Sequence, residues 1–128
     1  MTRAYLVLAG LIGAALGTMI LFAPVPFYAS YGMDLAGQVN LLNELRAHGL
    51  GLLGAGLFIA SGAFVPRLVP AATIVAVALY LSYGLSRLLA VLLDGMPSSS
   101  LLLAAGVEIA LGLVGLVLLL RSRRVASL

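Results

Sequence analysis

Four long apolar stretches restrict this chain to folds that a lipid bilayer can hold. They cover about residues 4–23, 45–65, 70–93 and 101–120, and only short connections remain between most of them. A helix needs about 20 apolar residues to cross the hydrocarbon core, because it rises about 1.5 Å per residue. The chain is 63% hydrophobic and 9% charged, whereas soluble proteins average about 45–50% apolar and about 25% charged residues. We therefore expect a single transmembrane domain over residues 1–128, with no separate soluble domain.

Proline, glycine and serine mark the ends of the expected helices. Pro24 opposes continuation of the first helix, and residues 66–70 are expected to form a tight connection between the second and third. Gly95 suits a left-handed cap after the third helix, and the serines at residues 98–100 can supply an N-cap for the fourth. Short connections make neighbouring helices antiparallel. The predicted fold is an all-α integral membrane four-helix antiparallel up-down bundle.

The first apolar run also has a competing interpretation as a cleaved signal peptide. Arg3 precedes the run, and residues 27–29 weakly resemble a cleavage region. However, the run is longer than the usual signal-peptide core of about 7–15 residues, and further spans follow it. We therefore expect it to be retained as a span.

The arginines predict the orientation of the bundle. All 7 basic residues are arginine, and those outside the candidate site lie at one end of an even-numbered bundle: Arg3, Arg67, Arg121, Arg123 and Arg124. Cationic loops normally stay in the cytoplasm, so both termini are expected there. These arginines are expected to contact anionic membrane lipids, and such a short basic tail does not indicate nucleic-acid binding.

The opposite half of the bundle collects polar residues that share helix faces. Residues three, four or seven apart lie on one face of a helix. By this spacing Glu44 and His48 share a face of the second helix, and Tyr83, Arg87 and Asp94 share a face of the third. The candidate ligand-binding residues are Glu44, Arg46, His48, Tyr83, Arg87, Asp94 and Glu108.

Arg87 and Glu108 are expected to form an ion pair. Arg87 lies about 10 Å along its helix from Asp94, and Glu108 lies about 12 Å from Ser100, so their depths match. A charge in hydrocarbon costs at least about 2.5–3.5 kcal/mol on insertion scales, so such residues usually pair or line a cavity. The alternative is a purely structural pair that fixes the register of the helices. Arg46, like Asp94, lies near a helix end, where snorkelling or capping is an alternative role.

Other patterns indicate packing. We expect Tyr80, like Tyr83, to pack with a satisfied hydroxyl group. Gly10, Gly13 and Gly17 predict a close-packing seam on the first helix. The aromatic residues around the first prolines predict an outer aromatic belt or a short interfacial helix that could lid the bundle: Phe22, Phe27, Tyr28 and Tyr31.

Three motifs support a family resemblance over nearly the whole chain. They are N-E-x-R at residues 43–46, Arg87 followed by D-G-x-P at residues 94–97, and Glu108 in the last span. With them the chain resembles a bacterial family of small four-span membrane proteins of unknown function that are similar to DoxX-like proteins. The resemblance implies the same site residues, together with Gly95 and Pro97, and a place in the bacterial inner membrane. It implies no activity, and the redox role associated with DoxX is not transferable to a chain without cysteine.

The first candidate function is binding or transport of a small ligand in a small polar pocket, enclosed by the outer half of the bundle. Arg46 and Arg87 would hold an anionic group, or the head of a quinone-like or lipidic molecule. Glu44, His48 and Glu108 would tune the charge or carry protons. We expect the pocket to be small, because a four-helix bundle leaves little central volume unless it oligomerises.

Two further functions remain open. In a structural or accessory protein the charges would lock the helices, and the outer loop would bind a membrane protein partner or a second copy of the chain. In an intramembrane enzyme Glu44 and His48 would be an acid/base pair, but no nucleophile or phosphate loop accompanies them, and we assign no catalytic residue. No cofactor or metal is expected, since the chain has no cysteine and one histidine.

Overall fold

The structure is a computed structural model that describes residues 1–128, and every regular element in it is a helix. The all-α class predicted from the sequence is therefore confirmed. The elements are α1 (Thr2–Phe22), α2 (Pro24–Ala29), α3 (Val39–Ser61), the 3-10 turn η1 (Pro66–Leu68), α4 (Val69–Asp94) and α5 (Ser99–Ala126).

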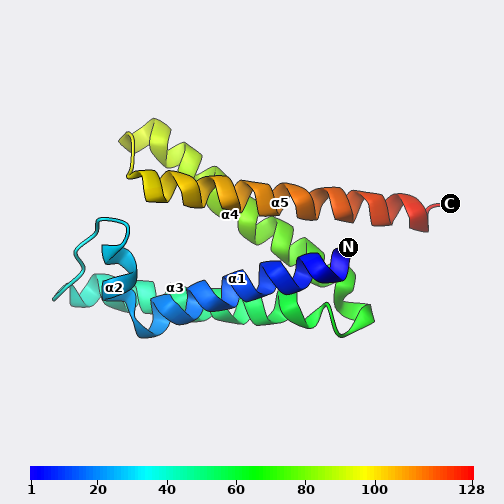
Figure 1. The fold of residues 1–128 in the computed structure, drawn as a ribbon, viewed down its shortest axis with the longest axis horizontal. Helices are drawn as coiled ribbons and strands as arrows, with labels where there is room; N and C mark the ends of the chain where they lie inside the picture. Colours follow the sequence, from blue (N-terminus) through cyan, green and yellow to red (C-terminus); the bar gives the residue numbers. More distant parts are fainter.

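The four long helices run alternately in opposite directions (Figure 1). α1 and α4 start at the end of the molecule that holds both termini, and α3 and α5 run back toward it. Packing is concentrated in two antiparallel pairs, α1 with α3 and α4 with α5. α1 and α5 lie closest near the termini and diverge toward the end where α2 lies (Figure 1). We call these two ends the terminal end and the α2 end.

Small residues bring α1 and α3 into backbone contact. A Cβ atom added at Gly56 would lie 2.3 Å from the backbone nitrogen of Ala14, and one added at Gly17 would lie 2.4 Å from that of Leu53. Side chains would hold these backbones apart, so glycine is required for this approach. The predicted close-packing seam of Gly10, Gly13 and Gly17 is confirmed, because all three are buried against α3.

The hydrophobic core lies toward the terminal end and joins the two helix pairs. Leu6 and Ile59 are fully buried at its centre. Tyr5 donates a hydrogen bond of 2.8 Å from its hydroxyl to the carbonyl of Leu111 on α5. Tyr80, on α4, donates its hydroxyl to the carbonyl of Ala9 on α1. The prediction that Tyr80 packs with a satisfied hydroxyl is confirmed, and the two tyrosines tie the helix pairs together at this end.

Several helix boundaries differ from the predicted ones. α3 begins at Val39 rather than at residue 45, and ends at Ser61. α5 continues to Ala126, so the basic C-terminal residues lie on its last turns and not in a tail. The longer helices follow from local hydrogen bonding, which continues through polar residues that an apolar window leaves out.

The caps around the α4 to α5 connection also differ in detail. Gly95 has a φ of 100°, as a glycine cap allows, but its ψ of −171° is extended and not left-handed helical. Ser98 is the N-cap of α5 without capping it through its side chain. Its hydroxyl instead donates a 3.3 Å hydrogen bond to the carbonyl of Tyr31, in the segment that connects α2 with α3.

Three helical segments are long and apolar enough to cross a membrane, as expected of a membrane protein. They are Thr2–Phe22, Pro66–Asp94 and Ser99–Ala126. The predicted second span is not among them, so a count of four is not confirmed. The reason is the first half of α3, where Glu44, Arg46 and His48 lower the mean hydropathy of an otherwise apolar helix.

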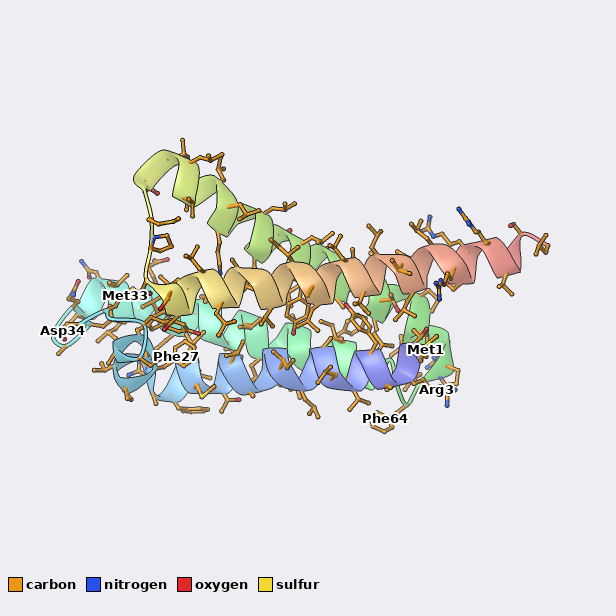
Figure 2. All side chains as sticks on the ribbon, turned by 45° about the horizontal axis from the view of Figure 1, so that its top comes forward. Met1, Arg3, Phe27, Met33, Asp34 and Phe64 are labelled. Carbon is orange, nitrogen blue, oxygen red and sulfur yellow. The ribbon has the colours of Figure 1, made fainter.

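Charged and aromatic side chains lie at both ends of the molecule. Figure 2 shows Met1, Arg3 and Phe64 at the terminal end, and Phe27, Met33 and Asp34 at the α2 end. The α2 segment itself forms the short helix predicted from its aromatic residues, with Pro24 in its first turn. The first half of α3, which contains three of the predicted site residues, also lies at the α2 end.

Candidate functional site

A cavity of about 540 Å³ lies between the two helix pairs toward the α2 end. Of its 19 lining residues, 14 are hydrophobic, and they come from all four long helices and from α2. The volume falls within the range of about 300–1,000 Å³ that is typical of small-molecule sites. The expectation of a polar pocket was wrong, because most of the residues that line the cavity are hydrophobic.

Four polar side chains gather on one part of the cavity wall. We call them the polar cluster: His48, Tyr83, Arg87 and Glu108. Arg87 donates from Nε to Oε2 of Glu108 at 2.8 Å and from Nη2 to Oε1 at 3.1 Å. This two-point contact confirms the predicted ion pair between α4 and α5. It is the strongest kind of side-chain hydrogen bonding available to an arginine.

The second half of the cluster joins α3 to α4. The hydroxyl oxygen of Tyr83 lies 3.0 Å from Nδ1 of His48, and the two rings meet edge to face with centroids 5.4 Å apart. The predicted satisfied hydroxyl of Tyr83 is thus confirmed. A neutral imidazole has one donor and one acceptor nitrogen, so this pair still presents hydrogen-bonding capacity to the cavity.

The charges of the cluster cancel. The Arg87 side chain is 35% exposed and that of Glu108 is 13% exposed, and each is the other's ion-pair partner. The cluster therefore presents hydrogen-bonding groups without a net charge when His48 is neutral.

Aromatic side chains from α2 and the following turn cover the cavity toward the α2 end. Phe27 packs edge to face on Tyr28 and on Tyr31, with ring centroids 5.1 Å and 5.3 Å away. All three rings line the cavity. Burial raises the pKa of the Tyr28 hydroxyl above its ordinary value, although the charge of Arg87 acts in the opposite direction. We call Phe27, Tyr28 and Tyr31 the aromatic cover.

Three of the predicted site residues lie away from the cavity. Glu44 and Asp94 are exposed and form no side-chain hydrogen bond or ion pair. Arg46 donates instead to the carbonyl of Leu21, near the end of α1, which matches the structural alternative at a helix end. His48, Tyr83, Arg87 and Glu108 are brought together. Spacing along single helices could not separate the residues in the cavity from those outside it, because spacing does not show where α3 and α4 diverge.

The apolar wall contains residues that the sequence analysis did not select. Ala104 and Val107 line the cavity beside Glu108, and Leu52 lines it one turn beyond His48. For Ala104 and Leu52, the helical spacing of four residues from Glu108 and His48 was the available signal. This signal is weak, because apolar residues are abundant on every face of this chain.

The comparison with known families adds one finding to this geometry. A family model described as a domain of unknown function, DUF4345, matches residues 1–119. The chain belongs to this family. The DUF4345 match includes the whole cavity and the polar cluster, and its description assigns no activity. It does not support the DoxX-like resemblance specifically, which stays a prediction. No curated protein and no solved structure matches the chain.

Proposed function

We propose that this DUF4345 protein binds a small, uncharged amphipathic molecule, quinone-like or lipidic, inside the membrane. One observation carries the proposal. The cavity has a predominantly apolar wall, and its polar cluster is concentrated on part of that wall. Sites of this composition hold the body of a ligand by apolar contact and orient it through a few polar groups.

The ion pair of Arg87 with Glu108 favours an uncharged ligand over the anionic ligand that was also expected from the sequence. Glu108 already compensates the charge of Arg87, so an anion would bring an uncompensated negative charge into a largely apolar cavity. The other expected anion-binding residue, Arg46, donates to a backbone carbonyl outside the cavity. Neutral carbonyl or hydroxyl groups can bond to the cluster without breaking the ion pair.

Packing at the terminal end favours binding over transport. Gly13 and Tyr80 are among the lining residues nearest the terminal end. Beyond them lies the core around Leu6 and Ile59, which are fully buried. A passage through the molecule would require this core to separate.

We further propose that α3 is the fourth span and that both termini are cytoplasmic in a bacterial inner membrane. α1 ends at the α2 end, whereas α4 starts at the terminal end, so α3 has to carry the chain back. Its backbone contact with α1 through Gly17 and Gly56 supports this position. Arg3 and Arg67 at the terminal end support the cytoplasmic assignment.

Single cysteines test this topology, because the chain has none of its own. A membrane-impermeant maleimide is expected to label Ala36→Cys, between α2 and α3, in intact spheroplasts. Phe64→Cys, between α3 and η1, should react only after lysis, as should Ser127→Cys at the C-terminus. Equal labelling of Ala36→Cys and Phe64→Cys in intact spheroplasts would show that α3 does not cross the membrane.

Filling the cavity tests the proposed binding. Native mass spectrometry of gently purified protein is expected to show a bound species of defined mass. Ala104→Phe adds a ring to the cavity wall and should lower its occupancy by at least about tenfold, which corresponds to about 1.4 kcal/mol. Ala110→Phe is the matched control, since Ala110 is exposed on the same helix and does not line the cavity. Absence of any bound species from the wild type, or equal occupancy in both variants, would contradict the proposal.

A second candidate is a structural or accessory protein, favoured by the two-point contact between Arg87 and Glu108. Such a pair fixes the register of α4 and α5 without a ligand. The double variant Arg87→Leu with Glu108→Leu separates the candidates, because it removes both charges together. Under the binding proposal it folds and loses the bound species. Under the structural candidate the wild type has no such species to lose.

A further inference from the structure

We infer, resting on the proposed function, that the ligand enters the cavity sideways from the bilayer, through a gap between α1 and α5. The ligand class is then a long-chain lipid with a small uncharged polar end, dissolved in the membrane and not in water.

The rim of this gap is formed by apolar residues on two helices. Ile12 and Leu16 of α1 and Leu103 and Val107 of α5 all line the cavity. Leu103 is 71% exposed and Val107 is 45% exposed. These two residues therefore line the cavity and are also accessible from outside the molecule. The opening therefore has an apolar rim between α1 and α5.

The two helices approach each other only farther toward the terminal end. There the Tyr5 hydroxyl bonds to the carbonyl of Leu111 at 2.8 Å. Gly115, one turn further along α5, packs against the same tyrosine ring. From this contact α1 and α5 diverge toward the α2 end (Figure 1), which leaves the gap open beside the cavity.

The depth of the rim places it within the hydrocarbon layer. Leu103 and Val107 lie about 6 Å and about 12 Å along α5 from its first residue, Ser99. A rim at this depth faces acyl chains. Toward water, in contrast, the aromatic cover lines the cavity, and the Ser98 hydroxyl holds the covering segment through the carbonyl of Tyr31.

The positions of the rim and the polar cluster define the chemistry of the ligand. The rim and the wall beside it accept a hydrocarbon chain. Three of the four cluster residues, His48, Tyr83 and Arg87, lie on α3 and α4. The fourth, Glu108, lies on the rim helix α5 and holds Arg87 there. The chain of a ligand can therefore lie in the gap while its polar end bonds to the cluster. A charged headgroup would have to leave the interface for hydrocarbon, which is costly, so the polar end is uncharged.

Tryptophan fluorescence can test the lateral entry, because the chain has no tryptophan. Leu52→Trp places one indole on the cavity wall of α3, in protein reconstituted into phosphatidylcholine vesicles brominated midway along the acyl chains. We expect these lipids to quench more than about half of the emission of Leu52→Trp, relative to unbrominated vesicles, and acrylamide in the water to quench little. Leu57, on the same helix, is 58% exposed, so Leu57→Trp is the control for full contact with lipid.

A bulky residue at the rim makes the test specific to the gap. Val107→Phe is combined in turn with each tryptophan variant. It is expected to reduce the quenching of Leu52→Trp by the brominated lipid and to leave the quenching of Leu57→Trp unchanged. Ile20→Trp, on the cavity wall of α1, replaces Leu52→Trp if the latter does not fold.

The outcomes separate lateral entry from binding itself. Quenching of the cavity tryptophan by acrylamide but not by brominated lipid would overturn lateral entry in favour of access from water. Quenching by neither, or no effect of Val107→Phe, would overturn it as well. A bound species in native mass spectrometry that Ala104→Phe removes would still support the cavity as a binding site in each case.

Discussion

Replacing Glu108 with alanine is expected to lower the free energy of unfolding by about 3 kcal/mol, in mixed micelles titrated with a denaturing detergent. The substitution leaves the Arg87 guanidinium without its carboxylate partner in a largely apolar cavity. The pair is partly buried, and removing one member costs more than removing both, because the remaining charge is uncompensated.

Two variants control for this effect. Asp94→Ala removes an exposed acid that has no partner, and it should change stability by less than about 0.5 kcal/mol. Arg87→Leu combined with Glu108→Leu should regain most of the stability lost in Glu108→Ala. If Glu108→Ala were no more destabilising than Asp94→Ala, the ion pair would be solvated and the cavity would be open to water.

Adding one methyl group at Gly56 is expected to destabilise the protein by about 1–3 kcal/mol. The Cβ atom of Gly56→Ala would lie 2.3 Å from the backbone nitrogen of Ala14 and 2.7 Å from the carbonyl oxygen of Gly10. Backbone atoms cannot rotate away as side chains do, so α1 and α3 must separate.

Gly54→Ala is the matched control on the same helix. A Cβ atom there meets nothing within 4 Å. Within a helix, alanine is more stabilising than glycine by about 0.5–1 kcal/mol. Unfolding in the same micelles should show Gly54→Ala to be neutral or slightly stabilising. Equal effects of the two substitutions would mean that the two helices are not in backbone contact.

The sequence predicted those features of the fold that depend on one helix at a time. Apolar runs located α1, α4 and α5, and small residues identified the face on which α1 packs. The ion pair could also be predicted from the sequence. Arg87 and Glu108 lie at similar distances from the short connection between their helices, and this fixes their relative depth.

Features that depend on angles between helices could not be obtained in this way. Glu44 has the same spacing relation to His48 as a cavity residue would, yet it is exposed beyond the point where α1 has ended. Asp94 is likewise exposed, because it lies at the end of α4 that diverges from α3. The size of the cavity has the same origin, since no helical periodicity encodes how far two helix pairs separate.

The tyrosine hydrogen bonds between the helix pairs have a mechanical consequence. Tyr5 and Tyr80 bond to backbone carbonyls of the opposite helix pair, and Tyr80 also lines the cavity. Together with the bond between Tyr83 and His48, they hold the two helix pairs at a fixed angle to each other. The width of the cavity therefore depends on these polar contacts as well as on the apolar packing around Leu6.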